Sequence, residues 1–298
     1  MITILGPTAC GKTHLATEVA YRLNGEIISA DSRQVFRGMD IGTGKDLSEY
    51  TIHNTQIPYH LIDICDPGFE YNAYMFQRDF YIAYDKIMAS GKTPVLCGGT
   101  GLYIESVLLQ YPFCDVPENP ELRAELSTKT DQELTEILKS FVKLHNHTDT
   151  ESRDRLIRAI EIQTLQQSTN IQVRPPIEGP VFGINYPREV VLQRIRKRLV
   201  ERLETGMVDE VQKLLDAGIS PERLKRYGLE YKFVTMFLEN EISYNELVEQ
   251  LNIAIRQFAK RQMTWFRRME RKGVPIVWIN PDLSFDEKIG FILEKHNH

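Results

Sequence analysis

The stretch Gly6-Pro7-Thr8-Ala9-Cys10-Gly11-Lys12-Thr13 decides the fold class of this chain. It matches the phosphate-binding pattern G-x-x-x-x-G-K-[ST] at every fixed position, between an apolar strand at residues 2–5 and a helical pattern at residues 12–23. The glycines let backbone N–H groups surround a phosphate at the positive end of the helix. Lys12 would neutralise the outer phosphate oxygens. We therefore predict a diphosphate or triphosphate site formed by this whole stretch, with Mg²⁺ as the cofactor and the Thr13 hydroxyl as its ligand.

The residues around this stretch alternate short apolar runs with helical patterns, as parallel βαβ units do. Strands are expected at residues 26–30 and 94–97, with a helix between them and another from Leu102. Beyond the middle of the chain, the pattern predicts a strand at 182–186, one long helix at 188–217, a helix at 244–271 and a last strand at 276–279. The expected fold class is α/β, a P-loop parallel sheet flanked by helices.

The middle of the chain lacks this alternation. Asn119-Pro120-Glu121 is an N-cap signature with proline at the first helical position. Amphipathic helices are expected at about residues 122–126, 134–144 and 152–167, and a linker rich in proline and glycine at 174–180. We predict a helical insertion domain at residues 114–178, within a P-loop core made of residues 1–113 and 179–298 with C-terminal helices.

The bulk composition is that of a globular protein, with 42% hydrophobic and 26% charged residues in a chain of 298. The four cysteines show no C-x-x-C pair, which indicates reduced thiols, and no apolar run approaches the roughly 18 residues that span a bilayer. We expect a cytoplasmic monomer with no membrane partner. The net charge of −5 argues against nucleic acid as a partner, but local clustering of basic residues decides where a phosphate backbone binds.

Two polar loops follow predicted strands. Asp31-Ser32-Arg33-Gln34 follows the second strand, and Cys97-Gly98-Gly99-Thr100-Gly101 ends a later strand and precedes a helix. Open α/β sheets bind ligands at the carboxyl ends of their strands, so both loops should face the phosphate site. Asp31 and Thr100 are also common turn- and helix-capping residues, and that structural interpretation remains open. No Asn-Lys pair exists, which excludes the guanine-specific N-K-x-D motif, whereas a small-molecule kinase remains possible.

Seven strings together resemble the bacterial tRNA dimethylallyltransferase family over about residues 2–279. They are GPTACGKT at 6–13, ADSRQVFRGMDIGTGK at 30–45, YHLIDICDP at 59–67, GGTGLYIE at 98–105, PELRAEL at 120–126, RDRLIRAIE at 153–161 and IRQFAKRQMTWFRRME at 255–270. The combination of the P-loop string with GMDIGT and AKRQ-x-TWFR is specific to this family, rather than to the nucleotide-binding fold as a whole.

The resemblance implies transfer of a dimethylallyl group from dimethylallyl diphosphate to the N6 amine of the adenosine just 3′ of the tRNA anticodon, with release of diphosphate. Asp31 matches the family's catalytic aspartate, which would take the amine proton. Thr100 matches a threonine that assists the same step, and Arg198 matches an arginine associated with the diphosphate. The implied partners are dimethylallyl diphosphate and the anticodon stem-loop of tRNA.

The resemblance also implies a set of tRNA-contacting residues, part of which lies in the helical insertion. Its members are Asp31, Ser32, Arg33, Gln34, Thr100, Arg123, Asp154, Arg155, Leu156, Ile157, Arg158, Lys260, Arg261, Gln262, Trp265, Arg267 and Arg268. Arg155 and Arg158 lie three apart on one helical face, which suits two neighbouring phosphates. The basic run at 256–272, taken alone, has a second interpretation as the solvated face of a helix.

Three segments depart from the family pattern. Cys10 stands where the family usually has serine, Glu230 replaces a glycine in Leu229-Glu230-Tyr231-Lys232, and Gly44-Lys45-Asp46 replaces Ala-Lys-Pro. We expect the phosphate site to survive the first change, because that position contributes mainly backbone. The second change adds negative charge to a segment that, by the family resemblance, contacts tRNA.

Two other functions stay open: a small-molecule or nucleoside kinase, and a nucleotide-gated RNA-binding module without prenyl transfer.

Overall fold

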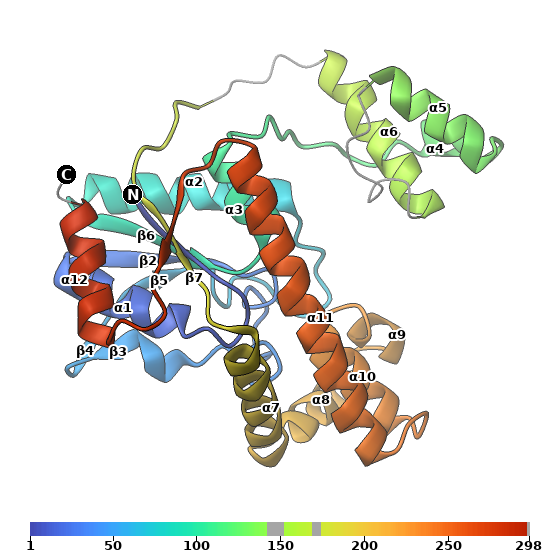
Figure 1. Cartoon of the computed structure of the whole chain (residues 1–298). Coiled ribbons are helices and arrows are strands. Elements are labelled where there is room, and N and C mark those ends of the chain that lie inside the picture. The colour runs from blue at the N-terminus through green and yellow to red at the C-terminus, as the bar shows by residue number, and fades with distance from the viewer. Residues whose placement is uncertain (142–151, 169–173, 297–298) are drawn as a thin grey trace. The chain divides into compact units, whose positions relative to one another are not determined.

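The computed structural model describes residues 1–141, 152–168 and 174–296 (Figure 1). The chain divides into two compact units, the first made of Met1–Gln110 with Pro176–His298 and the second of Tyr111–Pro175. The insertion therefore begins and ends three residues before the predicted positions 114 and 178. Within the described residues, no helix has the length and apolar character needed to cross a membrane.

The first unit is built on a parallel sheet, and this confirms the predicted fold class. The strand that leads into the P-loop lies near the centre of the sheet, so its carboxyl end has neighbouring strand ends on both sides. Among the described residues the six strands run in the order β5-β2-β6-β1-β7-β8, with bounds β1 Ile2–Leu5, β2 Gly25–Ala30, β5 Tyr59–His60, β6 Thr93–Gly98, β7 Val181–Ile184 and β8 Ile276–Ile279. The short edge strand β5, and the small hairpin of β3 (Thr51–Ile52) and β4 (Thr55–Gln56) after the 3-10 helix η1 (Leu47–Tyr50), had no signal in the sequence.

Helices cover both faces of the sheet, which explains why β1, β2 and β7 are buried along their whole length. One face packs against α1 (Lys12–Arg22) and α12 (Phe285–His296). The other face packs against α2 (Ala73–Ala89), α3 (Gly101–Leu108) and the C-terminal part of α11 (Tyr244–Arg271). Because the strands are parallel, the loops that leave their carboxyl ends all lie at one edge of the sheet.

A second group of helices gathers at that edge (Figure 1). It consists of α7 (Arg188–Glu204), α8 (Met207–Asp216), α9 (Pro221–Leu224), α10 (Leu229–Leu238) and the N-terminal half of α11. Helix α11 begins at a capping box formed by Ser243 and Glu246, and its 28 residues extend from this group to the sheet. One helix thus takes part in two cores.

The predicted single helix at 188–217 is wrong, because the chain turns at Gly206 between α7 and α8. Gly206 has φ 106°, a left-handed conformation that residues with a Cβ rarely adopt. The apolar pattern hid this break because Leu203 and Met207, on either side of it, are both buried in the same core. The spacing of apolar residues therefore does not reveal this turn.

The second unit is a small helical bundle. Its core consists of Leu126, Leu134, Leu138, Leu156 and Ile160, contributed by α4 (Pro120–Ser127), α5 (Asp131–Phe141) and α6 (Arg153–Ser168). The predicted N-cap forms, since the Asn119 side chain accepts a hydrogen bond of 3.0 Å from the backbone N–H of Leu122. Residues 142–144, at the end of the predicted second helix, lie outside the described residues.

Replacing Gly206 by Ala should lower the free energy of unfolding by about 1–3 kcal/mol, because the new Cβ is strained at this positive φ. Urea denaturation measures the change. Gly290→Ala is the matched control, since Gly290 lies inside α12 with open space around it and should stabilise the protein by about 0.5–1 kcal/mol. Equal stabilisation by both changes would contradict the strained turn.

Candidate active site

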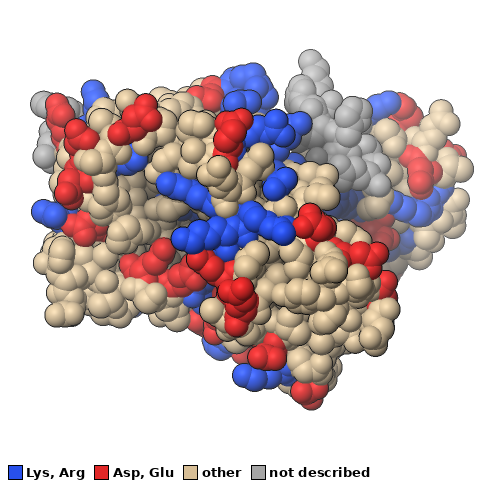
Figure 2. All heavy atoms as spheres, turned by 60° about the horizontal axis from the view of Figure 1, so that its bottom comes forward, with Lys and Arg blue, Asp and Glu red and all other residues tan. Residues whose placement is uncertain are grey.

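A cavity of about 800 Å³ lies at the carboxyl ends of the strands. It is lined by the P-loop, by residues 31–34 after β2, by residues 42–44 and 46, by residues 97–102 after β6, and by side chains of α7 and α11. Figure 2 views the molecule with this end turned forward, and Lys and Arg side chains gather near the centre of the face with Asp and Glu beside them. The sheet thus brings together loops that are far apart in the sequence.

The P-loop presents only part of the predicted phosphate-binding stretch to the cavity. Thr8, Ala9, Gly11, Lys12 and Thr13 line it, whereas Gly6, Pro7 and Cys10 do not, and the part of those three in phosphate binding stays a prediction. A Cβ on Gly6 would lie 2.7 Å from the Cys10 sulfur and 2.9 Å from the carbonyl oxygen of Ile184, so glycine is needed there for packing. Burial raises the pKa of the Cys10 thiol, and the serine-to-cysteine departure therefore leaves an inert, buried side chain.

Gln262 of α11 joins the P-loop to the loop after β6. Its Oε1 accepts a 2.8 Å hydrogen bond from the backbone N–H of Thr8, and its Nε2 donates a 2.9 Å bond to the carbonyl oxygen of Gly99. Gln262 is buried, and both ends of its amide are paired within the protein. The structure therefore gives Gln262 a positioning role, and because Gln262 also lines the cavity, its contact with tRNA stays a prediction.

The glycines after β6 let α11 approach closely. A Cβ on Gly99 would lie 2.5 Å from the Gln262 amide nitrogen, and a Cβ on Gly101 would overlap the Trp265 ring. Trp265, which the sequence placed in the tRNA-contacting set, consequently lines the cavity beside Thr100. Close packing against α11 is therefore a physical reason for glycine at positions 99 and 101.

Asp31 and Thr100 lie together at the ends of neighbouring strands and both line the cavity. The Thr100 hydroxyl accepts a 3.0 Å hydrogen bond from the backbone N–H of Ser32 and makes no capping bond to α3. Asp31 Oδ1 accepts a 3.0 Å bond from the backbone N–H of Arg33, so Asp31 does hold its own turn. The capping interpretation is therefore excluded for Thr100, whereas Asp31 stabilises a turn and faces the cavity as well.

One wall of the cavity is basic. Arg194, Arg198 and Arg202 project from α7 at intervals of four residues, and Arg198 Nη2 donates a 2.8 Å hydrogen bond to Asp46 Oδ2. Arg202 Nη2 lies 3.8 Å from the same carboxylate oxygen and has no hydrogen-bond partner among the described residues. Burial, and then the neighbouring Arg198, lower the pKa of Arg202 to about 10. Only Arg198 was predicted, although the four-residue spacing of these arginines was visible in the sequence.

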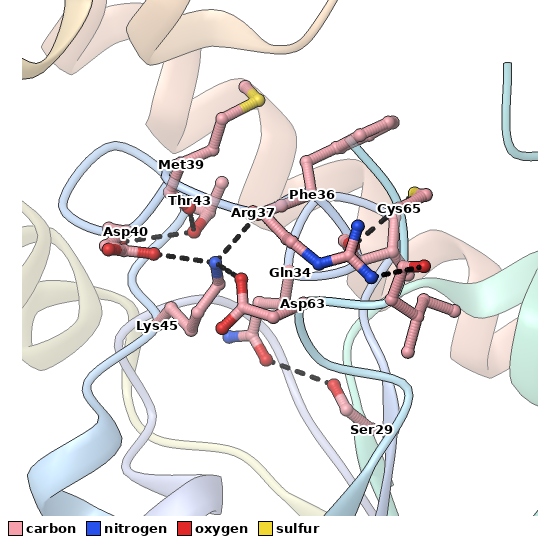
Figure 3. Close-up of polar contacts among 12 residues, drawn as sticks. Ser29, Gln34, Phe36, Arg37, Met39, Asp40, Thr43, Lys45, Asp63 and Cys65 are labelled. Carbon is pink, nitrogen blue, oxygen red and sulfur yellow. Dashed lines mark hydrogen bonds and ion pairs between the residues drawn. The ribbon is translucent and has the colours of Figure 1, made fainter. Parts of the chain in front are cut away.

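Lys45 anchors the loop that carries Asp46 (Figure 3). The buried Lys45 ammonium donates to the carbonyl oxygen of Phe36 and to the carboxylates of Asp40 and Asp63. Gln34 accepts from the Ser29 hydroxyl at 3.0 Å and donates to the carbonyl oxygen of Gly44 at 3.2 Å. Gln34, predicted to contact tRNA, is therefore a structural link as well as a cavity residue. The departure at positions 44–46 forms an ordered loop that presents a carboxylate to the basic wall.

Glu230, the second departure from the family pattern, also places a carboxylate against an arginine. Glu230 lines the cavity, and its Oε2 accepts a 3.1 Å hydrogen bond from Arg33, whose guanidinium also lies 5.0 Å from the centre of the Phe258 ring. The negative charge expected to oppose tRNA is thus neutralised within the protein. The adjacent Tyr231 is fully buried and donates to Glu210 at 2.6 Å, so it lies beyond the reach of a ligand.

The basic run of α11 separates into residues with different surroundings. Arg261 and Trp265 line the cavity, and Lys260 and Arg267 are exposed. Arg268 packs over the Trp265 ring at 4.9 Å. The interpretation as a solvated face therefore fits Lys260 and Arg267 but not the other predicted residues of this helix.

In the second unit, Glu161 organises two of the predicted tRNA-contacting arginines. Its side chain is 1% exposed, and it accepts two 2.8 Å hydrogen bonds from Arg123 and one of 3.1 Å from Arg158. Burial opposes ionisation, but the bonds from Arg123, the Asn119 N–H and Arg158 together lower the pKa of Glu161 to about 2. Asp154 and Arg155 are exposed, and Ile157 packs on the bundle core. The Leu156 side chain is buried in that core, which contradicts its predicted contact with tRNA.

Comparison with known proteins identifies clear relatives. A sequence model of the family described as IPP transferase matches residues 34–269. A protein of Parabacteroides distasonis named tRNA dimethylallyltransferase 1 is 54% identical over 97% of this chain and 95% of its own length. Bacteroides fragilis has a protein named tRNA dimethylallyltransferase 2 that is 53% identical over 99% of this chain and 97% of its own length.

Solved structures give the same picture. The crystal structure of tRNA isopentenylpyrophosphate transferase from Bacillus halodurans is similar with a TM-score of 0.70 and 33% identity, covering 99% of this chain and 95% of that one. A eukaryotic dimethylallyltransferase acting on tRNA shares the fold with a TM-score of 0.76 at 23% identity, covering 94% of this chain and 73% of that one.

Asp46→Asn should tighten the binding of inorganic diphosphate in metal-free buffer about two- to tenfold, because it frees Arg198 and removes a like charge from the cavity. Isothermal titration calorimetry measures the change. Asp66→Asn is the control, since Asp66 pairs with Arg37 at 2.8 Å and does not line the cavity. Weaker binding by the Asp46→Asn variant would show instead that this carboxylate helps to hold the ligand.

The second unit should lose about 3 kcal/mol of stability as the pH falls from about 4.5 toward about 2. The pKa of Glu161 is lower in the folded state than its ordinary value of 4.5, so its contribution is present above 4.5 and disappears on protonation. Hydrogen–deuterium exchange across residues 120–127, measured against pH, follows this loss. Glu161→Gln should remove this part of the pH dependence, and a variant with the same pH profile as the parent would contradict it.

Proposed function

The chain belongs to the IPP transferase family, and we propose that it transfers a dimethylallyl group from dimethylallyl diphosphate to the N6 amine of the adenosine 3′ of a tRNA anticodon. Its relatives are named tRNA dimethylallyltransferases over nearly the whole chain, so prenyl transfer to tRNA is the activity that the family gives it. The donor, the acceptor atom and the nucleotide position are the finer parts of the proposal. The observation that carries them is the cavity in which a P-loop, a basic wall and Asp31 meet.

The diphosphate would bind between the P-loop and α7. The first turn of α1 has no side-chain cap, which leaves its N–H groups for an anionic ligand, and Lys12 lies beside them. Arg198 and Arg202 face the same space from the opposite side. An allylic carbon–oxygen bond ionises readily when positive groups stabilise the departing diphosphate, and this wall supplies them.

Thr13 would hold a Mg²⁺ ion in this cavity. The Thr13 hydroxyl lines the cavity and makes no hydrogen bond within the described part of the chain, and hydroxyl and phosphate oxygens are ligands that Mg²⁺ prefers. No group of three or more His, Cys, Asp or Glu side chains in the described residues could hold a metal by itself. When bound, Mg²⁺ would stabilise negative charge on the leaving group.

Asp31 would act as the general base on the acceptor side. Its second carboxylate oxygen has no hydrogen-bond partner among the described residues, so it is available for a proton. In the transfer step, the N6 nitrogen forms a bond to the allylic carbon, the carbon–oxygen bond breaks, diphosphate leaves, and the amine proton passes to Asp31. Leu102, Phe258 and Trp265 provide apolar surface for the prenyl chain.

Incubation with unmodified tRNA, Mg²⁺ and labelled dimethylallyl diphosphate tests the proposal. Labelled RNA is expected, and nuclease digestion with mass spectrometry should locate the label on the adenosine 3′ of the anticodon. Label on another nucleotide would refute the finer assignment. ATP turnover without labelled RNA would restore the kinase hypothesis, and RNA binding without a covalent product would restore the RNA-binding module.

Asp31→Asn should reduce the single-turnover rate of prenyl transfer by ~10²–10⁴-fold, because the amide cannot accept the proton. The amide oxygen can still accept the bond from Arg33 N–H, so the turn and the thermal midpoint should be retained. Rate, midpoint and tRNA affinity are measured on one preparation, with Asp66→Asn as a surface control. A folded Asp31→Asn variant whose rate lies within about threefold of the parent would overturn the base assignment.

A further inference from the structure

A second hollow of about 730 Å³ adjoins the cavity on the other side of residues 32–33. Ser32 and Arg33 line both spaces, so one short backbone segment forms a wall between them. The rest of the lining comes from residues 36, 69–71, 220, 222–223 and 226–228. Phe69, Arg223 and Arg226 line this hollow but not the cavity, and the proposed chemistry uses none of the three.

The hollow contains one aromatic ring that is free to stack. Phe69 is 49% exposed, and within the described residues its ring packs against no other aromatic ring. The other rings of the lining are held in place: Tyr227 packs edge-on against Phe36 with ring centres 4.8 Å apart, and its hydroxyl accepts from the backbone N–H of Gly68. The Tyr71 hydroxyl donates to Asp79 at 2.9 Å. Phe69 is thus an exposed stacking surface on a fixed aromatic base.

Two arginines of the hollow have no internal partner. Within the described residues, the guanidinium groups of Arg223 and Arg226 make no hydrogen bond or ion pair, whereas the neighbouring Lys225 is paired with both Glu239 and Glu241. Glu70 and Glu222 also line the hollow, so its charge is mixed rather than uniformly basic. An exposed ring beside unpaired guanidinium groups is the chemistry that binds an unstacked nucleotide, through its base and its phosphate.

We propose that this hollow binds the nucleotide adjacent to the target adenosine, with its base stacked on Phe69 and its phosphate held by Arg223 and Arg226. The inference rests on the proposed function. An adenosine whose amine reaches Asp31 has to leave the stack of the RNA loop, and its neighbour then loses a stacking partner. The base of this neighbouring nucleotide would stack on Phe69 instead, on the other side of the wall formed by Ser32 and Arg33.

A double-mutant cycle, with one change in the protein and one in the RNA, tests the stacking contact. Binding of fluorescent anticodon stem-loops is measured by anisotropy without the prenyl donor, for RNA that is intact or abasic at either neighbour of the target adenosine. Phe69→Ala should weaken binding of intact RNA by about 5- to 100-fold. It should have little effect on RNA that is abasic at the stacked position, because the two changes remove the same contact. Tyr244→Ala, which removes an aromatic residue of similar exposure (47%) at the start of α11, should bind as the parent does.

The salt dependence of RNA binding tests Arg223 and Arg226 separately from Phe69. Arg223→Ala and Arg226→Ala should each reduce the slope of log affinity against log salt by about 0.7, the contribution of one phosphate in a single strand. Arg196→Ala, which removes an arginine paired with Glu249 away from both spaces, should leave the slope unchanged. The Michaelis constant for dimethylallyl diphosphate should stay within about twofold in all these variants.

Several outcomes would overturn the inference. Equal weakening of intact and abasic RNA by Phe69→Ala would show that the ring stacks on neither neighbour, and unchanged affinity would show that the hollow takes no nucleotide. Failure of the proposed function is distinguishable, because it would appear as absence of prenylated RNA with the parent protein, whereas the binding cycle requires no chemistry.

Discussion

The two hydrogen bonds of the Gln262 amide, one accepted from Thr8 N–H and one donated to the Gly99 carbonyl, hold together the two loops on which the cavity is built. These loops leave β1 and β6, which are neighbours in the sheet although they are far apart in the chain. Because Gln262 belongs to α11, the same contact fixes the long helix against the sheet, and the helices that pack on α11 are fixed with it. Gly99 and Gly101 make this possible, since a Cβ at either position would collide with α11. The geometry of the cavity therefore depends on close helix packing as much as on the P-loop.

The cavity resolves the apparent conflict between a net charge of −5 and anionic substrates. Three arginines of one helix face and Lys12 gather in a single concave space, where local charge and not the total decides what binds. Acidic residues are not excluded from the same space: burial and the nearby Asp46 raise the pKa of Glu49, while Arg198 opposes this shift. Charged groups in the cavity are therefore close enough to shift each other's pKa without a bound ligand.

The sequence predicted the fold class and the loops of the site because each carries a local signal: the P-loop spacing, the apolar strands and the glycines after β6. It did not reveal the turn at Gly206, since the buried stripe on either side runs without interruption. It also could not separate residues that face a ligand from residues that support them. Gln262 and Leu156 stand within strings typical of RNA contact, yet one bridges two loops and the other fills a core. That distinction depends on which way a side chain points, which a string of letters does not contain.

Two of the three departures from the family pattern, Asp46 and Glu230, have a common physical explanation in the structure. Asp46 and Glu230 each hold an arginine of the cavity, at 2.8 Å and 3.1 Å. An arginine held in this way has already lost much of its side-chain entropy, so less is lost when a phosphate binds. The internal carboxylate also competes with that phosphate, which lowers affinity. Under the proposed function, Asp46 acts on the diphosphate side and Glu230 on the RNA side. The two departures therefore adjust how tightly each substrate is held, and leave Asp31 and the P-loop, on which the transfer step depends, unchanged.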